Sequence, residues 1–321
     1  MAMREIEYCV VDVFTTRAFQ GNSAAVVTDG GALSDRAMAH VAAEINVSET
    51  AFVLPATPFS QADLRLRWFS PKCEVSMCGH ATIAAIQVLA ETGKLPAGLA
   101  TAEQPIVIET KGGMLQAQIE PPTAAPLSES RPIVWLDLVS PKLEKQSLEP
   151  ERLAGLLGTS PDAFAAEPAP VRTQDNDFIV FVKDVLRLNA LQPAFDPLAA
   201  WSNTQRLRGI CVSTTSTLAP AITVQSRFFA PAAVGIREDP VTGSVHGPLA
   251  AHLVECGLVK TFDNLAALTC VQATPTGRAG LIRVLVQRQA DNHYEVRIGG
   301  QCTPLTRRVL RLGADFSNPV S

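Results

Sequence analysis

The sequence predicts an α+β protein built from two similar halves. Its 321 residues exceed the usual length of a single domain, and only 18% of them are charged, which leaves enough apolar residues for two cores. Short strand-like runs alternate with a few helical segments along the whole chain. A pattern in the first half also recurs once in the second half. These three observations together favour two pseudo-symmetric lobes.

The repeat joins two glycine-containing segments that lie about half the chain apart. One set of residues is offset by 164 positions and matches Gly79, Leu89, Glu91 and Gly93 with Gly243, Leu253, Glu255 and Gly257. A second set is offset by 160 positions and matches Trp68, Phe69 and Pro71 with Phe228, Phe229 and Pro231. Each copy predicts an aromatic strand end, a proline-containing loop, a glycine, a helix of about three turns and a C-terminal glycine cap.

Strands in the first half are predicted where β-branched, aromatic or alternating residues form short runs. These runs cover 10–14, 23–27, 52–54, 64–69 and 106–109. A helix is expected over 34–45, because apolar residues recur there with helical spacing after Ser34, a candidate N-cap. The proline-rich segment 120–132 has the composition of a linker between the halves.

The second half is expected to contain helices at 150–157 and near 197–201. Its predicted strands cover 178–182, 209–212, 222–229, 282–287 and 294–298. The expected domains are therefore an N-terminal lobe over 1–125 and a C-terminal lobe over 133–313, with the last strands able to cross back to the first lobe.

Charge and composition favour a small-molecule partner. The net charge of −4 gives no basic surface for nucleic acid or an anionic membrane. The N-terminal residues lack the apolar stretch of a signal peptide, so no export is expected. Seven cysteines without a C-x-x-C pair argue against a disulfide framework or a zinc ribbon. We expect a protein of the reducing cytoplasm.

Common nucleotide-binding and hydrolase motifs are absent. The chain contains no G-x-x-x-x-G-K-[ST], no G-x-G-x-x-G that opens a βαβ unit, no G-x-S-x-G and no H-E-x-x-H. His252 and Glu255 have helical spacing but no further ligands beside them, and a metal site needs three or four donors. The sequence therefore predicts neither a cofactor nor a metal.

The two repeated glycines mark the predicted helix starts. Gly79 is followed by His80, and Gly243 is followed by Ser244. A helix N-terminus has unpaired N–H groups and the positive end of the helix dipole, and a glycine there lets a ligand approach the backbone, so two such ends can bind a carboxylate. Taken singly, Ser244 also fits a simple N-cap and His80 a hydrogen-bonded structural histidine. Cys78, which precedes the predicted helix start at Gly79, fits either a reactive thiol or a small buried residue.

Four ordered blocks of the chain resemble the PhzF-like (phenazine biosynthesis-like) family, which shares the fold of diaminopimelate epimerase. The blocks are Val11-Asp12-Val13-Phe14 with Phe19-Gln20-Gly21-Asn22, then Asn46-Val47-Ser48-Glu49-Thr50, then Cys78-Gly79-His80-Ala81-Thr82, and Glu238-Asp239-Pro240-Val241-Thr242-Gly243-Ser244. The resemblance implies two lobes, each a curled, mostly antiparallel sheet around a central helix, with the site in the cleft between them. It also implies a homodimer and an enzyme without a cofactor.

The resemblance assigns roles to several residues. Glu49 corresponds to the acid/base of the family, and His80, Asp239 and Ser244 correspond to substrate-facing positions. We take Glu49, His80 and Asp239 as the catalytic residues, and we expect burial to raise the pKa of Glu49. The expected substrate-binding residues are Asn22, Ser48, Gly79, Gly243 and Ser244. Cys78 is a possible further participant, and His246 lies one turn inside the second helix, where a small residue is expected.

The sequence thus predicts a cofactor-independent isomerase that moves a proton by general acid/base catalysis. The expected substrate is a small cyclic amino or hydroxy acid that resembles dihydro-hydroxyanthranilate. One alternative is an epimerase or racemase that uses Cys78 with Asp239 or Glu49, since the Cys78 block also resembles the first cysteine block of proline racemases. A second alternative is a protein that binds a small acid or a partner without chemistry.

Overall fold

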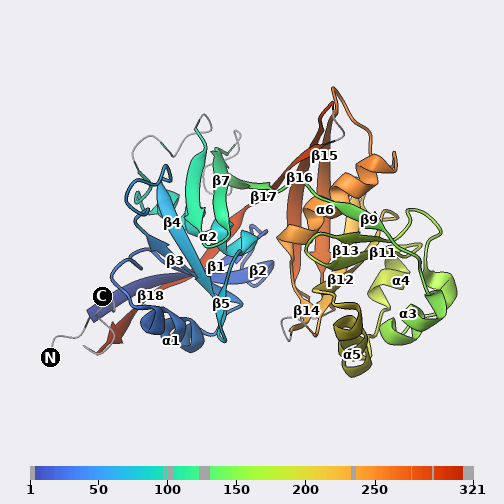
Figure 1. Cartoon of the computed structure of the whole chain (residues 1–321), viewed down its shortest axis with the longest axis horizontal. Coiled ribbons are helices and arrows are strands. Elements are labelled where there is room, and N and C mark those ends of the chain that lie inside the picture. The colour runs from blue at the N-terminus through green and yellow to red at the C-terminus, as the bar shows by residue number, and fades with distance from the viewer. Residues whose placement is uncertain are drawn as a thin grey trace. The chain divides into compact units, whose positions relative to one another are not determined.

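A computed structural model gives the structure of the chain (Figure 1) and describes residues 4–96, 99, 104–122, 131–232, 236–275, 277–290 and 293–313. Contacts divide the chain into two compact units. The first unit comprises Met1–Asp137 and Gly299–Ser321, and the second comprises Leu138–Ile298. This division falls at residues 137 and 138, whereas the sequence analysis placed it in the segment 120–132, of which 123–130 lie outside the described residues.

The first unit is built mainly of strands around two helices. Its elements are β1 (Arg4–Val13), β2 (Asn22–Val27), α1 (Asp35–Ile45), β3 (Glu49–Leu54), β4 (Leu64–Phe69), β5 (Glu74–Val75), α2 (Gly79–Glu91), β6 (Ile106–Thr110), β7 (Gly113–Glu120), β8 (Ile133–Leu138) and β18 (Cys302–Leu312). β1 pairs antiparallel with both β2 and β18, so the last strand of the chain belongs to this unit. β2 pairs parallel with β3, and β3 pairs antiparallel with β4.

The second unit has the same kinds of element in the same order, with additional helices. Its elements are β9 (Leu143–Lys145), α3 (Pro150–Leu157), a 3₁₀ turn (Pro161–Ala163), β10 (Val171–Thr173), β11 (Asp177–Phe181), α4 (Val185–Asn189), α5 (Phe195–Gln205), β12 (Gly209–Thr214), β13 (Val224–Ala230), β14 (Ile236–Asp239), α6 (Gly243–Glu255), β15 (Leu265–Ala273), β16 (Ala279–Arg288) and β17 (Tyr294–Gly300). β11 pairs parallel with β12, and β12 pairs antiparallel with β13.

Strand registers confirm the repeat. Thr50 lies opposite Phe69 in the first unit, and Ile210 lies opposite Phe229 in the second, 160 positions later in both strands. In each unit the second strand of this hairpin then pairs antiparallel with a short strand and parallel with a later one, through β5 and β6 in one case and β14 and β15 in the other. The predicted fold class is therefore confirmed: α+β, with curled and mostly antiparallel sheet in two related halves.

A central helix fills the core of each unit. α2 and α6 have 13 residues each, and ten residues of α2 and eleven of α6 are buried. A helix that is apolar on all sides needs surroundings on all sides, and the curled sheet of its own unit supplies them. None of the helices in the described part of the chain is both long and apolar enough to cross a membrane.

An arginine–glutamate pair is also repeated in front of each central helix. Arg67 contacts Glu74 at 2.8 Å, and Arg227 contacts Glu238 at 2.7 Å. Each arginine also lies over the ring of the phenylalanine two residues later in its strand, at 5.2 and 5.0 Å from the ring centroid. The pair ties the strand to the short segment that leads to the helix start, so both copies fix the helix N-terminus in the same way.

Candidate active site

Three of the predicted site residues meet in the first unit, between the start of β3 and the start of α2. Oε2 of Glu49 lies 3.1 Å from Nε2 of His80. Sγ of Cys78 lies 3.5 Å from Nδ1 of the same histidine. The side chains of Glu49 and His80 are 17% and 11% exposed, and Cys78 is buried. His80 thus joins a carboxylate to a thiol at the helix N-terminus.

Local structure explains why Glu49 lies there. Ser34 caps the start of α1, as predicted, by accepting a hydrogen bond from the Ala37 amide. Asn46 ends α1 in the left-handed conformation that asparagine tolerates well, with φ of 55°. The chain then turns directly into β3, so its first residue, Glu49, lies at a strand end rather than inside the sheet.

Two further predicted residues lie beside Glu49. The Ser48 hydroxyl donates to Oδ1 of Asn22 at 3.0 Å, and Asn22 is 1% exposed. This contact joins the start of β2 to the start of β3 and holds the residue before Glu49. In the structure Asn22 and Ser48 therefore position the strand end on which the carboxylate is carried.

The pKa of Glu49 is lowered, which corrects the expectation that burial raises it. Burial by itself raises this pKa, but the close contact with His80, its positive charge and the contact with Cys78 together outweigh burial. Burial lowers the pKa of His80, whereas its contacts with Cys78 and Glu49 raise it well above the ordinary value. Burial also raises the pKa of Cys78, so the thiol is uncharged near neutral pH and Glu49 is the charged partner of His80.

Glu49 and His80 accordingly form an ion pair of a base and an acid. The angle of the 3.1 Å contact falls outside hydrogen-bond geometry at Nε2, so the attraction is mainly between the charges. A thiol, an imidazole and a carboxylate within 4.8 Å of one another also have the donor types of a zinc site. His80 already uses both ring nitrogens toward its neighbours, and the raised pKa of Cys78 disfavours the thiolate that binds metal.

The other predicted residues lie in the second unit, around the start of α6. Asp239 ends β14, Gly243 is the first residue of α6 and Ser244 is the second. Oδ2 of Asp239 accepts a hydrogen bond of 2.5 Å from the Thr242 hydroxyl. Gln272 lies across the same segment: its Nε2 donates to the Asp239 carbonyl at 2.7 Å, and its Oε1 accepts from the Thr242 amide at 2.9 Å.

Two charged residues in this set were missed by the sequence analysis. Arg208 precedes β12, and Nη2 of its guanidinium donates to Oγ of Ser244 at 3.1 Å. Asp177, the first residue of β11, accepts from Nε of Arg208 at 2.8 Å and also from Nη2. Arg208 corresponds to Ser48, which lies 160 positions earlier. This correspondence becomes visible only when the strand registers of the two units are compared, so the sequence alone did not point to Arg208.

His246 does not line an open space. It is fully buried, with Nε2 2.9 Å from the Ser226 hydroxyl and Nδ1 2.8 Å from the Thr242 carbonyl. Burial lowers its pKa to about 4, so the ring is neutral near pH 7 and donates to one partner while it accepts from the other. His246 therefore supports the start of α6 from inside the unit.

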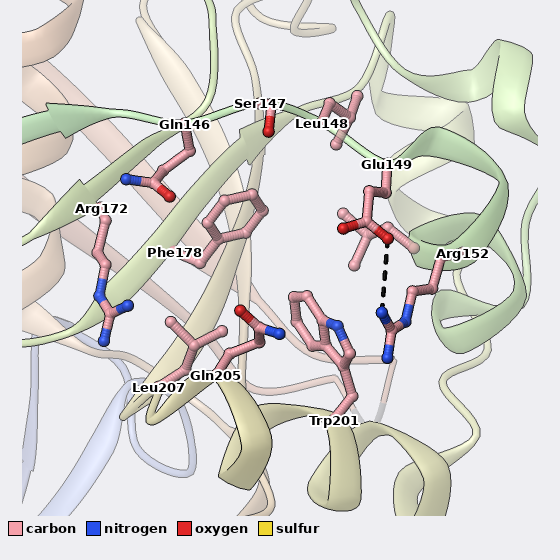
Figure 2. A pocket seen from close by; sticks show the side chains of 11 residues that line it. Gln146, Ser147, Leu148, Glu149, Arg152, Arg172, Phe178, Trp201, Gln205 and Leu207 are labelled. Atoms are coloured by element: carbon pink, nitrogen blue, oxygen red, sulfur yellow. Dashed lines mark hydrogen bonds and ion pairs between the residues drawn. The ribbon is translucent and has the colours of Figure 1, made fainter.

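A small cavity of about 110 Å³ lies elsewhere in the second unit (Figure 2). Phe178 and Trp201 face into it, and their rings make an edge-to-face contact with centroids 6.2 Å apart. Phe178 follows Asp177 in β11. Because successive side chains of a strand point to opposite faces, the side chain of Asp177 points away from the face on which this cavity lies. Ligand sites usually have volumes of about 300–1,000 Å³. This cavity is smaller, and none of the predicted site residues lines it.

Comparison with known proteins agrees with the residue blocks. Residues 11–308 match the family described as phenazine biosynthesis-like protein, PhzC-PhzF. A protein of Halalkalibacterium halodurans that is named an uncharacterized isomerase is 34% identical over 303 residues, which cover 94% of this chain and 97% of that protein.

Solved structures agree with the fold. A PhzF-family phenazine biosynthesis protein from Bacillus anthracis has a TM-score of 0.83 at 25% identity, with 96% of this chain and 99% of that chain covered. A hydroxyproline epimerase from Agrobacterium vitis has a TM-score of 0.61 at 15% identity, with 98% and 93% covered, and shares the fold alone. Given the family match over most of its length and this fold, the chain belongs to the phenazine biosynthesis-like family, and it is an isomerase of that family.

Proposed function

We propose that this isomerase moves a proton by general acid/base catalysis on a small cyclic amino or hydroxy acid, without a cofactor. The observation that carries the proposal is the Glu49–His80 pair, with its atoms 3.1 Å apart at a helix start. An ionised carboxylate and a protonated imidazole are a base and an acid that are both ready near neutral pH. The lowered pKa of Glu49 and the raised pKa of His80 favour that pair of protonation states.

In the proposed reaction Glu49 accepts a proton from a carbon atom of the substrate. The electron pair of that C–H bond moves into the conjugated system, and the positive charge of His80 stabilises the negative charge that develops on the substrate. Glu49 then returns the proton to a different carbon, so the enzyme is regenerated and the product is an isomer.

The start of each central helix is suited to bind a carboxylate. Neither α2 nor α6 has a side chain that caps its first turn, whereas α1 is capped by Ser34 and α4 by Asp184. A first turn without a side-chain cap can offer N–H groups to an anion, and in α2 the Ala81 amide also contacts the Cys78 thiol. We propose Gly79, Gly243 and Ser244 as substrate-binding residues of this kind.

Asp239 is proposed as the third catalytic residue of the same reaction. Its carboxylate can hold the amine or hydroxyl of the substrate and exchange a proton with it. Asn22 and Ser48 are proposed to assist at the end that carries Glu49. The seven cysteines, all free, support the proposed reducing cytoplasm. A homodimer is also proposed, and light scattering on the purified protein tests it through the molar mass.

Incubation with a panel of cyclic amino and hydroxy acids in deuterated water tests the proposed chemistry. We expect NMR to show loss of a carbon-bound hydrogen or formation of an isomer from at least one compound with the native protein. Glu49→Gln is expected to abolish this exchange, because an amide cannot accept the proton. Binding without exchange across the whole panel favours the alternative of a protein that binds small acids without chemistry.

Contact between Cys78 and His80 supports a second candidate, an epimerase in which the thiol is one of the two acid/base groups. The distance of 3.5 Å is short enough for proton transfer from Sγ to the ring. Its partner would be Asp239 or Glu49. This candidate requires Cys78→Ala to abolish turnover, whereas the Glu49 proposal expects a mild effect from that variant.

A further inference from the structure

Arg208 is held as a fixed cation in the second unit. Its Nε donates to Oδ1 of Asp177 at 2.8 Å, and its Nη2 donates to Oδ2, so the guanidinium is fixed by two parallel bonds. The Asp177 side chain is 1% exposed, while that of Arg208 is 34% exposed. A buried carboxylate is strongly unfavourable without a partner, and the guanidinium supplies it. In this pair the carboxylate of Asp177 is therefore buried, whereas part of the Arg208 guanidinium is accessible to solvent.

The accessible edge of the guanidinium lies at the first turn of α6. Nη2 donates to Oγ of Ser244, the second residue of that helix, at 3.1 Å. Nη1 carries two further N–H groups, and it makes no hydrogen bond to any residue in the described ranges. A positive side chain at a helix N-terminus is unfavourable, because the helix dipole is positive there as well. Asp177 offsets the charge of the guanidinium, but among the described residues the N–H groups of Nη1 remain unused beside the first turn of α6, where an anion can accept hydrogen bonds from them.

Comparison of the two copies shows that this arrangement replaces the acid/base pair of the first unit. The strand registers and the helix starts match Ala24 with Asp177, Ser48 with Arg208, Glu49 with Gly209, and His80 with Ser244. A Cβ atom on Gly209 would lie 2.2 Å from the Phe228 ring, so no side chain fits at the position equivalent to Glu49. The second copy has lost the carboxylate and the imidazole, and it has gained a guanidinium with its own buried partner.

We propose that Arg208 binds the carboxylate of the substrate, together with Ser244 and the first-turn N–H groups of α6. This inference rests on the proposed function in one respect, namely that the bound acid is the substrate of the enzyme. It defines the substrate as a free acid and excludes neutral amides or esters of the same ring. The favoured substrate class is therefore a small acid whose carboxylate is ionised.

Titration with a matched pair of probes tests the inference: 2-aminocyclohexanecarboxylate and its neutral amide, 2-aminocyclohexanecarboxamide. The readout is the side-chain Nε–H signal of Arg208 in protein with ¹⁵N-labelled arginine, together with the dissociation constant. We expect the acid to shift this signal and to bind more tightly than the amide. Arg208→Gln is expected to weaken binding of the acid by about 10- to 100-fold, the usual effect of hydrogen bonds to a charged group.

Arg206→Gln is the matched control, since this exposed arginine lies two residues away and its substitution makes the same change in charge. It is expected to bind both probes as the native protein does. If Arg208→Gln does not fold because Asp177 is left unpaired, the double variant Asp177→Asn with Arg208→Gln removes both charges and is expected to show the same loss.

Three results would overturn the inference: no shift of the Arg208 signal up to the solubility limit of the acid, equal binding of acid and amide, or native binding of the acid by Arg208→Gln. Failure of the proposed function is distinguishable from these results. A protein that binds the acid through Arg208 but shows no hydrogen exchange that depends on Glu49 retains this inference and loses the proposed chemistry.

Discussion

His80 is the residue on which the electrostatics of the candidate site depend. It contacts Glu49 at 3.1 Å and Cys78 at 3.5 Å. Its contacts with Cys78 and Glu49 raise its pKa, and its own contact with Glu49 lowers the pKa of that carboxyl. Sequence alone gave the residue types through a family resemblance. It did not give the direction of the Glu49 pKa, because a partner 31 positions away in the chain decides it.

Substitution of His80 is expected to change stability in a pH-dependent manner. A histidine with a raised pKa in the folded state adds stability below its ordinary value of 6.5, and it loses that contribution as pH rises through the folded-state pKa. His80→Asn should therefore be less stable than the native protein by about 1–3 kcal/mol at pH 6, with a smaller difference at high pH. Urea unfolding at a series of pH values measures this, and a pH-independent difference would contradict the ion pair.

Glu49 should show the opposite dependence. Its lowered pKa adds stability above the ordinary value of 4.5, and this contribution disappears as pH falls through the folded-state pKa. The stability difference between native protein and Glu49→Gln is thus expected to shrink under acid conditions. The same urea series checks it, with Glu7→Gln, an exposed glutamate, as the control.

At the scale of elements, the sequence predicted strands and helices where side chains show a strong pattern. The strand 64–69 and the helix 150–157 have the predicted bounds, because alternating apolar residues that end in two aromatic residues mark the first and regular apolar spacing marks the second. β15 was missed, since its buried positions alternate but several of them carry small residues such as Ala266 and Cys270. β18 was missed because its adjacent arginines hide the alternation and its partner β1 is at the other end of the chain.

Gly209 at the start of β12 is expected to be intolerant of a side chain. A Cβ atom there would lie 2.2 Å from the Phe228 ring, and a ring packed in this way cannot move aside easily. Gly209→Ala is expected to destabilise the protein by about 1–3 kcal/mol.

Gly155 provides the matched control for this prediction. It lies in α3, with nothing within 4 Å of the position of a Cβ atom, so Gly155→Ala is expected to stabilise by about 0.5–1 kcal/mol through helix propensity. Thermal or urea unfolding of both variants measures the change in the free energy of unfolding and shows whether each substitution destabilises or stabilises the protein. Equal effects of the two substitutions would argue against the close contact in β12.

At the scale of the whole molecule, the chain is a duplicated unit in which the two copies have diverged in chemistry. The registers of the hairpins and the arginine–glutamate pairs are shared, whereas Glu49 and His80 are matched by Gly209 and Ser244. The repeat was visible in the sequence as spaced glycines and aromatics. The difference between His80 and Ser244 was visible as well, but the Asp177–Arg208 pair was not, because these two residues are 31 positions apart and only strand pairing brings them together.

Removal of the last strand should affect one unit only. β18 pairs with β1 along the register from Arg4 with Leu312 to Val13 with Cys302. A chain that ends after Gly300 leaves β1 with β2 as its paired neighbour among the strands whose registers are described. Hydrogen–deuterium exchange is expected to show faster exchange in β1 and β2, with α3, β11 and β12 still protected. Uniform loss of protection in both units would contradict the division of the chain.

The turnover of Glu49→Gln, measured on a compound that the native protein isomerises, tests the central claim most directly. Glutamine preserves the size of the side chain and removes its ability to accept a proton. The account predicts a decrease in kcat of at least about 100-fold with a smaller change in KM, and a mild effect of Cys78→Ala measured in parallel. Native turnover by Glu49→Gln, with loss of activity in Cys78→Ala, would contradict it.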